Sequence, residues 1–348
     1  MTRFSRREFL EIAGLGAAAA AMPSACASCS TTPQAPKPVA DAPEPSAEKP
    51  KPSAKALGRV VSRSDPSVFA TEGLDAARVA DRVNRVVAAL VDVSDPREAY
   101  RALFSPDDVV AIKVNCLAGP GMSSSPAVVD AIVSGLVSIG VPFTSIWIFE
   151  RFTAELERAG FTPNVDSEDR PRCLGNDDGG FTNELSSSGA VGSLWSRVLA
   201  KRATALVNVP VLKDHDLAGV GCAMKNMYGA IHNPNRYHEN NCDPFVADVS
   251  AHPFVRDKLK LVVADALTAQ YQGGPARVQT HQWRPGTVLA SRDPVAMDRV
   301  AQKLIEVERA AHGLPTLAEA KRPPKWLDTA FARGLGENRL EKIVLDVG

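Results

Sequence analysis

The sequence has no excess of charge of either sign, because its 40 Lys and Arg residues equal its 40 Asp and Glu residues. Proteins that hold DNA, RNA or an anionic membrane over a broad surface usually carry a clear basic excess. We therefore expect neither nucleic acid nor a membrane surface as the main partner. Any site for an anion must be local.

Long apolar runs are also missing. The apolar stretch from Ile12 to Met22 has about 11 residues, whereas a helix needs about 20 to cross a bilayer. It follows residues 5–10 (SRREFL), which resemble the twin-arginine export signal. We predict that residues 1–30 are a signal peptide cut after residues 25–27, that the twin-arginine export machinery delivers the protein to the periplasm, and that no transmembrane anchor remains after processing. A lipid anchor on Cys26 is the alternative.

Cysteine is scarce and poorly spaced for metal chemistry. Two of the six cysteines, Cys26 and Cys29, lie within the predicted signal peptide, and the other four contain no Cys-x-x-Cys pair. A built-in ferredoxin-type cluster needs such closely spaced cysteines, so it is not expected. A chain this long does not need disulfides to stabilise its core, and buried free thiols are the default expectation.

Composition divides the rest of the chain into a linker and a folded part. Residues 31–56 contain seven prolines among Ala, Lys, Glu and Ser. Such a segment cannot bury a core and predicts a disordered, extended linker. Residues 57–348 show no second linker and no internal repeat. They are predicted to form a single α/β domain.

Short apolar segments rich in β-branched residues alternate with helical patterns in this domain. Strands are predicted at residues 108–117, 146–149, 205–212, 259–266, 287–290 and 342–347. Helices are predicted from Ser125-Pro126 to about residue 140, over residues 219–231, and from Asp293-Pro294 to about residue 311. Residues 57–104 are expected to add a helical layer, and residues 162–189 a polar insertion. The fold class is α/β, with a mostly parallel sheet and helices on both faces in a Rossmann-like layering.

Ligands of open α/β sheets bind at the carboxyl ends of the strands, so the loops there are the first candidates. Lysine and asparagine side chains gather in these loops. Two glycines stand at the start of the predicted helix at 219–231, whose free N–H groups would attract an anion. A second glycine pair follows the strand predicted at 259–266. The predicted site for a small anion consists of Lys113, Asn115, Asn208, Lys213, Gly219, Gly221, Lys225, Asn226, Gly273 and Gly274.

His215 is the candidate general acid or base, because imidazole titrates near neutral pH. Asp265 or Asp248 would orient it; Asp265 is the preferred catalytic partner. The adjacent Asp214 is excluded from that role, since neighbouring side chains of a strand point to opposite faces. The competing interpretation of His215 is a hydrogen-bonded structural residue.

A metal site is a further candidate in the polar segment 232–244 (HNPNRYHENNCDP), which is predicted to be a loop over the site or at its rim. His232, His238 and Cys242 would be its ligands, although their spacing fits no compact metal motif. NAD is not expected as a cofactor. Met224 occupies the position where the dinucleotide fingerprint G-x-G-x-x-G requires its third glycine.

Six segments match, in order and spacing, the domain of unknown function 362 family, which the chain resembles over about residues 105–347. They are residues 112–115 (IKVN), 208–215 (NVPVLKDH), 223–229 (AMKNMYG), 265–266 (DA), 273–275 (GGP) and 293–298 (DPVAMD). The resemblance implies no agreed activity. Some relatives carry ferredoxin-like cysteine clusters and many carry export signals, which implies a redox setting. This sequence lacks the cluster and has Asp214 where Thr is common, which argues against redox chemistry by this chain alone.

These observations favour an exported enzyme that acts on a small anionic ligand at the carboxyl ends of the strands. Two alternatives remain open. One is a non-catalytic binding or assembly factor for a redox enzyme. The other is an electron-transfer protein that holds a metal ion or an iron–sulfur cluster.

Overall fold

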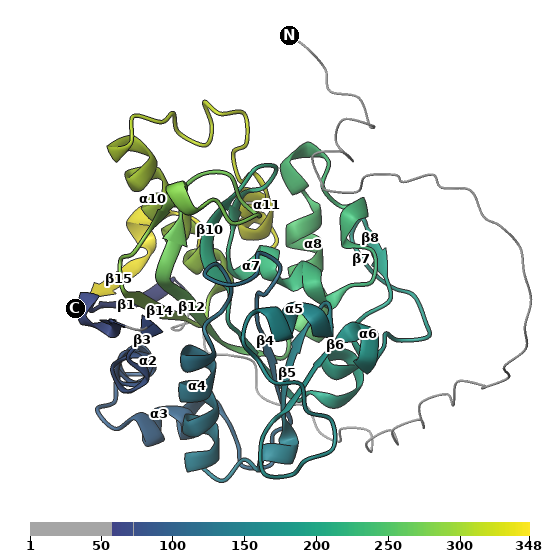
Figure 1. Ribbon diagram of the computed structural model, residues 1–348. Coiled ribbons are helices and arrows are strands. Elements are labelled where there is room, and N and C mark those ends of the chain that lie inside the picture. The colour runs from purple at the N-terminus through teal and green to yellow at the C-terminus, as the bar shows by residue number, and fades with distance from the viewer. Residues whose placement is uncertain (1–57, 72) are drawn as a thin grey trace, which may run out of the picture. The chain divides into compact units, whose positions relative to one another are not determined.

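The computed structural model describes residues 58–71 and 73–348 (Figure 1). The predicted signal peptide and linker, with Arg6, Arg7 and Cys26, lie outside the described residues. The main path of the sheet runs in the order β15-β1-β14-β12-β9-β4-β5-β6. These strands are β1 (Arg59–Ser64), β4 (Val110–Lys113), β5 (Ile146–Glu150), β6 (Arg172–Gly175), β9 (Ala205–Asn208), β12 (Leu259–Gln270), β14 (Thr287–Ser291) and β15 (Val344–Val347).

The sheet is mostly parallel, as predicted. Neighbouring strands from β12 to β6 all pair in parallel, and β14 alone on the described path runs against both of its neighbours. Shorter strands lie beside this path: β10 (Val211–His215) pairs with β12 and with β11 (Gly219–Gly221), and β13 (Gln282–Trp283) pairs with β12. Two separate hairpins are formed by β2 (Phe69–Ala70) with β3 (Gly73–Leu74), and by β7 (Ser186–Ser188) with β8 (Val191–Ser193).

Helices cover both faces of the sheet, which confirms the predicted fold class (Figure 1). On one face, α2 (Ala76–Leu90), α3 (Pro96–Leu103) and α4 (Pro126–Ser138) share an apolar core with β4 and β5. The other face packs against α7 (Ala223–Asn226), α8 (Phe245–Ala251), α10 (Pro294–Ala311) and α11 (Trp326–Ala332). The shorter helices are α5 (Thr153–Arg158), α6 (Asn176–Gly179) and α9 (Pro253–Arg256).

Two helix starts agree with their sequence signals. Helix α10 begins at Pro294, and the Asp293 carboxylate accepts hydrogen bonds from the N–H groups of Val295 and Ala296. Helix α4 begins at Pro126, but the side chain of Ser125 makes no capping bond. The Asp265 carboxylate, 140 residues further along the chain, instead accepts from Ser125 N.

Four segments differ from the sequence prediction. The strand predicted at 205–212 is two strands, β9 and β10, which pair with successive parts of β12. Residues 219–231 do not form one helix, because Gly219–Gly221 is strand β11, α7 has four residues, and a 3-10 helix follows from Met227 to Ala230. Residues 57–104 and 162–189 each contain a sheet strand, β1 and β6, in addition to the expected helices and loops.

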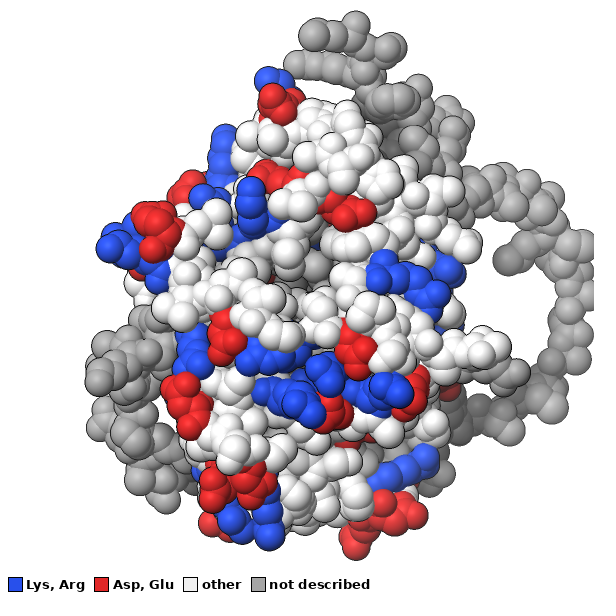
Figure 2. All heavy atoms as spheres, turned by 90° about the vertical axis from the view of Figure 1, so that its left-hand side faces the viewer, with Lys and Arg blue, Asp and Glu red and all other residues white. Residues whose placement is uncertain are grey.

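Charges of both signs are mixed on the surface of the described part. Figure 2 shows one face, on which Lys and Arg side chains lie next to Asp and Glu side chains. Ion pairs such as Arg63 with Asp346 and Arg85 with Asp81 account for part of this mixing. No helix among residues 58–348 with a described placement has both the length and the apolar character needed to cross a membrane.

Candidate functional site

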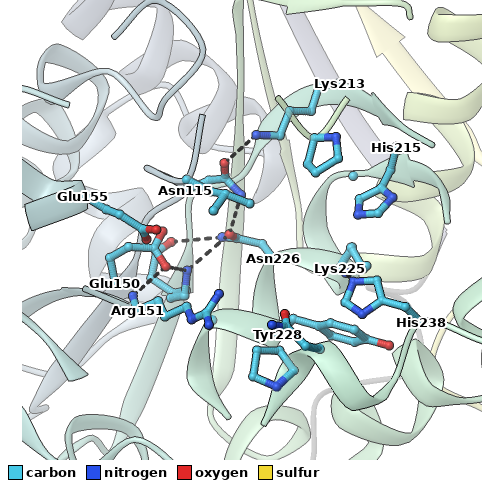
Figure 3. A pocket seen from close by; sticks show the side chains of 17 residues that line it. Asn115, Glu150, Arg151, Glu155, Lys213, His215, Lys225, Asn226, Tyr228 and His238 are labelled. Atoms are coloured by element: carbon cyan, nitrogen blue, oxygen red, sulfur yellow. Dashed lines mark hydrogen bonds and ion pairs between the residues drawn. The ribbon is translucent and has the colours of Figure 1, made fainter. Parts of the chain in front are cut away.

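A cavity of about 240 Å³ lies beyond the carboxyl ends of β4 and β5, between them and β10 (Figure 3). Its lining includes six of the predicted ligand-binding residues and the predicted acid-base residue. These are Lys113, Asn115, Lys213, Gly221, Lys225, Asn226 and His215. The predicted loop 232–244 also contributes, through Pro234, Asn235 and His238. The loop therefore borders this cavity.

Side-chain amides tie the strand ends to α7. Asn115 Nδ2 donates to Asn226 Oδ1 at 3.0 Å, and Asn226 Nδ2 donates to Asn208 Oδ1 at 2.7 Å. Asn208 Nδ2 in turn donates to the carbonyl oxygen of Ala223 at 2.7 Å. Asn208 does not line this cavity; it holds the side chain of Asn226, which does. Because these side-chain amides are joined by successive hydrogen bonds, they hold the cavity wall in one arrangement.

Lys113 is held as a structural ion pair rather than as a free cation. Its Nζ lies 2.7 Å from Glu150 Oε1, and both side chains are at least 95% buried. Glu150 also accepts hydrogen bonds from the backbone N–H groups of Arg151 and Cys116. Gly229 permits this pair, because a Cβ there would lie 2.6 Å from Lys113 Cε and 2.7 Å from Glu150 Oε1. The predicted ligand role of Lys113 is thus weakened, since its charge is already neutralised.

Lys213 and Lys225 differ from Lys113 because neither forms an ion pair with a carboxylate of the described residues. Lys213 Nζ donates to Asn115 Oδ1 at 2.8 Å. Lys225 Nζ lies 3.1 Å from His238 Nε2 and 3.6 Å from the centroid of the Tyr228 ring. Burial lowers the pKa of each ammonium to about 8, because removing water destabilises the charged form. Two buried cations without counterions therefore face one cavity.

The two cavity histidines are held in opposite tautomers. His215 Nδ1 accepts hydrogen bonds from the backbone N–H groups of Leu217 and Ala218 at 3.1 and 3.2 Å, which leaves its proton on Nε2. His238 Nε2 faces the Lys225 ammonium and must accept from it. Burial and the nearby Lys225 charge lower the pKa of His215 well below its ordinary value and that of His238 to about 4. Both rings are neutral at physiological pH, and the tautomer of His215 offers an N–H donor at Nε2 in place of a lone pair.

The predicted anion site at a helix N-terminus is wrong. Gly219 and Gly221 belong to the β10–β11 hairpin, where they pair with His215 and Lys213. The N-terminus of α7 comes later, and the Asp298 carboxylate occupies it by accepting from Ala223 N and Met224 N at 2.6 and 2.8 Å. Gly221 still lines the cavity, whereas Gly219 has a φ of +76° and packs against the backbone of Arg322.

Neither predicted carboxylate orients His215. Asp265 accepts hydrogen bonds from Ser125 N and Leu267 N and does not line the cavity, and burial raises its pKa to about 6. Asp248 accepts from Ala190 N and pairs with Arg333. Backbone amides take the orienting role instead. Asp214 points away from the cavity as expected, to an ion pair with Arg322.

The second glycine pair supports β10 instead of a ligand. A Cβ on Gly274 would lie 2.0 Å from the carbonyl oxygen of Asp214, and Gly274 N donates to Asp214 Oδ1. Gly273 has a φ of +84°, which favours glycine. The residue that follows them, Pro275, lines the cavity. Gly273 and Gly274 thus position Pro275 in the cavity wall, but they do not line the cavity themselves.

The three predicted metal ligands are not brought together. The His232 ring packs edge-on against the Phe181 ring, with 5.1 Å between the ring centroids. His238 faces Lys225. Cys242 is a buried free thiol in the core that contains Tyr228. Within the described part of the chain, no group of three or more His, Cys, Asp or Glu side chains could hold a metal ion. Cys116, Cys173 and Cys222 are likewise free and buried, as expected.

Sequence reasoning missed four polar residues of the cavity: Glu150, Arg151, Glu155 and Tyr228. Glu150 and Arg151 directly follow the predicted strand at 146–149, so the rule that selected Lys113 and Asn115 would also have selected them. Glu155 lies on the short helix α5 that follows, where no local pattern separates it from the exposed Glu157.

Comparisons with known proteins give a family and no activity. A crystal structure of a Thermotoga maritima protein, determined by the Northeast Structural Genomics Consortium, aligns with a TM-score of 0.39 at 10% identity. The alignment covers 68% of this chain and 59% of that one, so this chain spans less than two thirds of that protein. No curated protein matches. The model of the domain of unknown function (DUF362) matches residues 110–303, more than half of the sequence. The chain therefore belongs to the DUF362 family.

Proposed function

We propose that this protein is an enzyme that binds a small anion in the cavity beyond β4 and β5 and transfers a proton to or from it. One observation carries the proposal. Lys213 and Lys225 are buried, line the same space and have no carboxylate partner among the described residues. Burying a charge without a partner is costly, and an anionic ligand between the two ammonium groups removes that cost.

Lys225 is the candidate proton carrier. With a pKa of about 8, it exchanges a proton near physiological pH far more readily than an ordinary lysine. His215 complements it. As a neutral ring with its proton on Nε2, it is suited to stabilise developing negative charge by a hydrogen bond, without supplying a proton itself.

The binding step is tested by calorimetric titration with inorganic phosphate. Lys213→Met and Lys225→Met keep most of the aliphatic stem and remove the charge. Each is expected to weaken binding about ten- to a hundredfold, since a charge-assisted hydrogen bond contributes roughly 1.5 to 3 kcal/mol. Lys303→Met, at an exposed position of α10, is the matched control and should bind as the wild type does. Equal affinities of all four proteins would refute the site.

Turnover separates an enzyme from a binding factor. The wild type and Lys225→Met are incubated with a mixture of small anionic metabolites, and substrate loss is followed by mass spectrometry. An enzyme consumes at least one compound, and consumption stops in Lys225→Met. A compound that binds and is never converted would support the non-catalytic binding or assembly factor instead.

We also propose that the protein is exported to the periplasm by the twin-arginine pathway. Support comes from the sequence alone, in Arg6 and Arg7 before a short apolar stretch. Changing both to Lys should leave the protein folded in the cytoplasm. Cell fractionation that finds the double variant in the periplasm at the wild-type level would reject this proposal.

A further inference from the structure

Glu155 is a cavity residue whose carboxyl group forms no hydrogen bond or ion pair with the described residues. It lies on α5, is 6% exposed and lines the same space as Lys213 and Lys225. Its Oε2 atom is buried and has no hydrogen-bond partner among the described residues. Buried polar groups nearly always have a partner, so an unpaired carboxyl at a cavity wall favours a donor that enters the cavity.

No neighbouring cation supplies that donor. Lys113 is engaged with Glu150, and the Arg151 guanidinium lies 4.7 Å from the centroid of the Phe152 ring. Burial, and next the nearby Glu150 charge, raise the pKa of Glu155. Both effects oppose ionisation of this carboxyl and outweigh the charges of Lys113, Arg151 and Arg158, which lower its pKa. An ammonium group in direct contact would favour the ionised form.

The unpaired groups of opposite sign lie on different sides of the cavity. In Figure 3, Glu155 lies beside Glu150, whereas Lys225 and His238 lie across the space and Lys213 lies above it. A single small molecule in about 240 Å³ therefore meets the two lysines across and above the space and a carboxyl beside Glu150. A simple anion would satisfy only the lysines.

We propose that the natural ligand is a small amino-bearing anion, in which a phosphate, phosphonate or carboxylate binds between Lys213 and Lys225 while a primary ammonium donates to Glu155. This inference rests on the proposed anion site and adds the second recognition group. It narrows the substrate class from small anions to zwitterionic aminoalkyl phosphates and amino acids.

Matched pairs of probes test the ammonium group alone. Calorimetry compares ethyl phosphate with 2-aminoethyl phosphate, and propionate with 3-aminopropionate, at about pH 7. The amino compound of at least one pair is expected to bind about tenfold more tightly to the wild type, the gain typical of one charge-assisted hydrogen bond. In Glu155→Gln the preference should fall to about twofold or less, while the compound without the amino group keeps its affinity.

Glu157→Gln is the control, since Glu157 is exposed on the same helix, and it should keep the wild-type preference. A wild type without amino preference in either pair, or a preference that survives in Glu155→Gln, would overturn the inference. Should Glu155→Gln fail to fold, the comparison of amino and non-amino probes on the wild type still tests the inference, because a wild type without amino preference overturns it. Binding of plain anions without amino preference overturns only this inference, whereas the absence of all anion binding also overturns the proposed function.

Discussion

Nζ of Lys225 lies 3.1 Å from Nε2 of His238, and the two groups fix each other's protonation. An ammonium can only donate, so His238 must present a lone pair at Nε2. The low pKa of His238, about 4, keeps that lone pair free over the physiological range. His238 therefore acts as a positioning residue for Lys225, and not as the metal ligand predicted from sequence.

Anion affinity is predicted to fall as the pH rises through about 8. The ammonium forms of Lys213 and Lys225 attract the anion, and each has a pKa of about 8 in the free protein. Sulfate is the suitable probe, because its own charge is constant over this range. Calorimetry should show nearly constant affinity below about pH 7. Well above pH 8 the affinity should fall about tenfold per pH unit for each of the two lysines, which is about a hundredfold for both.

The histidines serve as the internal check on this profile. Both are neutral throughout because their pKa values are lowered, so no second step is expected between about pH 5.5 and 7. Affinity that increases with pH, or that changes chiefly near pH 6.5, would contradict the assignment of the charges.

Lys225 is also predicted to make the ligand-free protein depend on pH for its stability. Its pKa is about 8 in the folded state and about 10.4 when unfolded, so the unfolded chain binds more protons between these values. The free energy of unfolding contributed by Lys225 therefore rises with pH, by about 2 kcal/mol between pH 7.5 and 9.5. Urea unfolding of Lys225→Met should lack this increment, and parallel pH curves for the two proteins would disprove it.

Local sequence signals were enough to predict those helices and strands whose structure depends on residues adjacent in sequence. Asp293 and Pro294 begin α10 because a carboxylate can cap the N–H groups two and three residues ahead and proline suits the first turn. The β-branched run at β4 is buried on both faces. Since parallel strands end at the same edge, Lys113, Asn115 and Lys213 line one cavity.

The structural features that were not predicted depend on contacts between residues distant in sequence. Residues 219–231 lack one helix because Gly219 and Gly221 pair with β10 and because Asp298, 74 residues after Met224, caps α7. Asp265 similarly caps α4 over 140 residues. The sequence offers Asp265 as a candidate catalytic group, and only the fold shows that backbone amides already occupy its carboxylate and that of Asp298.

Breaking the Lys113–Glu150 pair is predicted to destabilise the fold strongly, in contrast to Lys225→Met. Lys113→Met leaves the buried Glu150 carboxylate without its cation, which typically costs about 3 to 5 kcal/mol. The double variant Lys113→Met/Glu150→Gln removes both charges and should recover part of that loss. Chemical unfolding of the two variants measures the difference. A single variant as stable as the wild type would show that Lys113 is a free cation after all.

Two substitutions of His215 are predicted to distinguish a structural role of this side chain from a role in anion binding. Asn can place Oδ1 near the position of Nδ1 and accept from Leu217 N and Ala218 N, which His215 satisfies at 3.1 and 3.2 Å, but it lacks the Nε2–H donor. His215→Asn should therefore unfold within about 1 kcal/mol of the wild type and lose about tenfold in sulfate affinity. His215→Phe removes both functions and leaves two backbone donors unsatisfied, so its free energy of unfolding should fall by about 2 kcal/mol or more. Were the histidine purely structural, His215→Asn would bind sulfate as the wild type does, and only His215→Phe would be impaired.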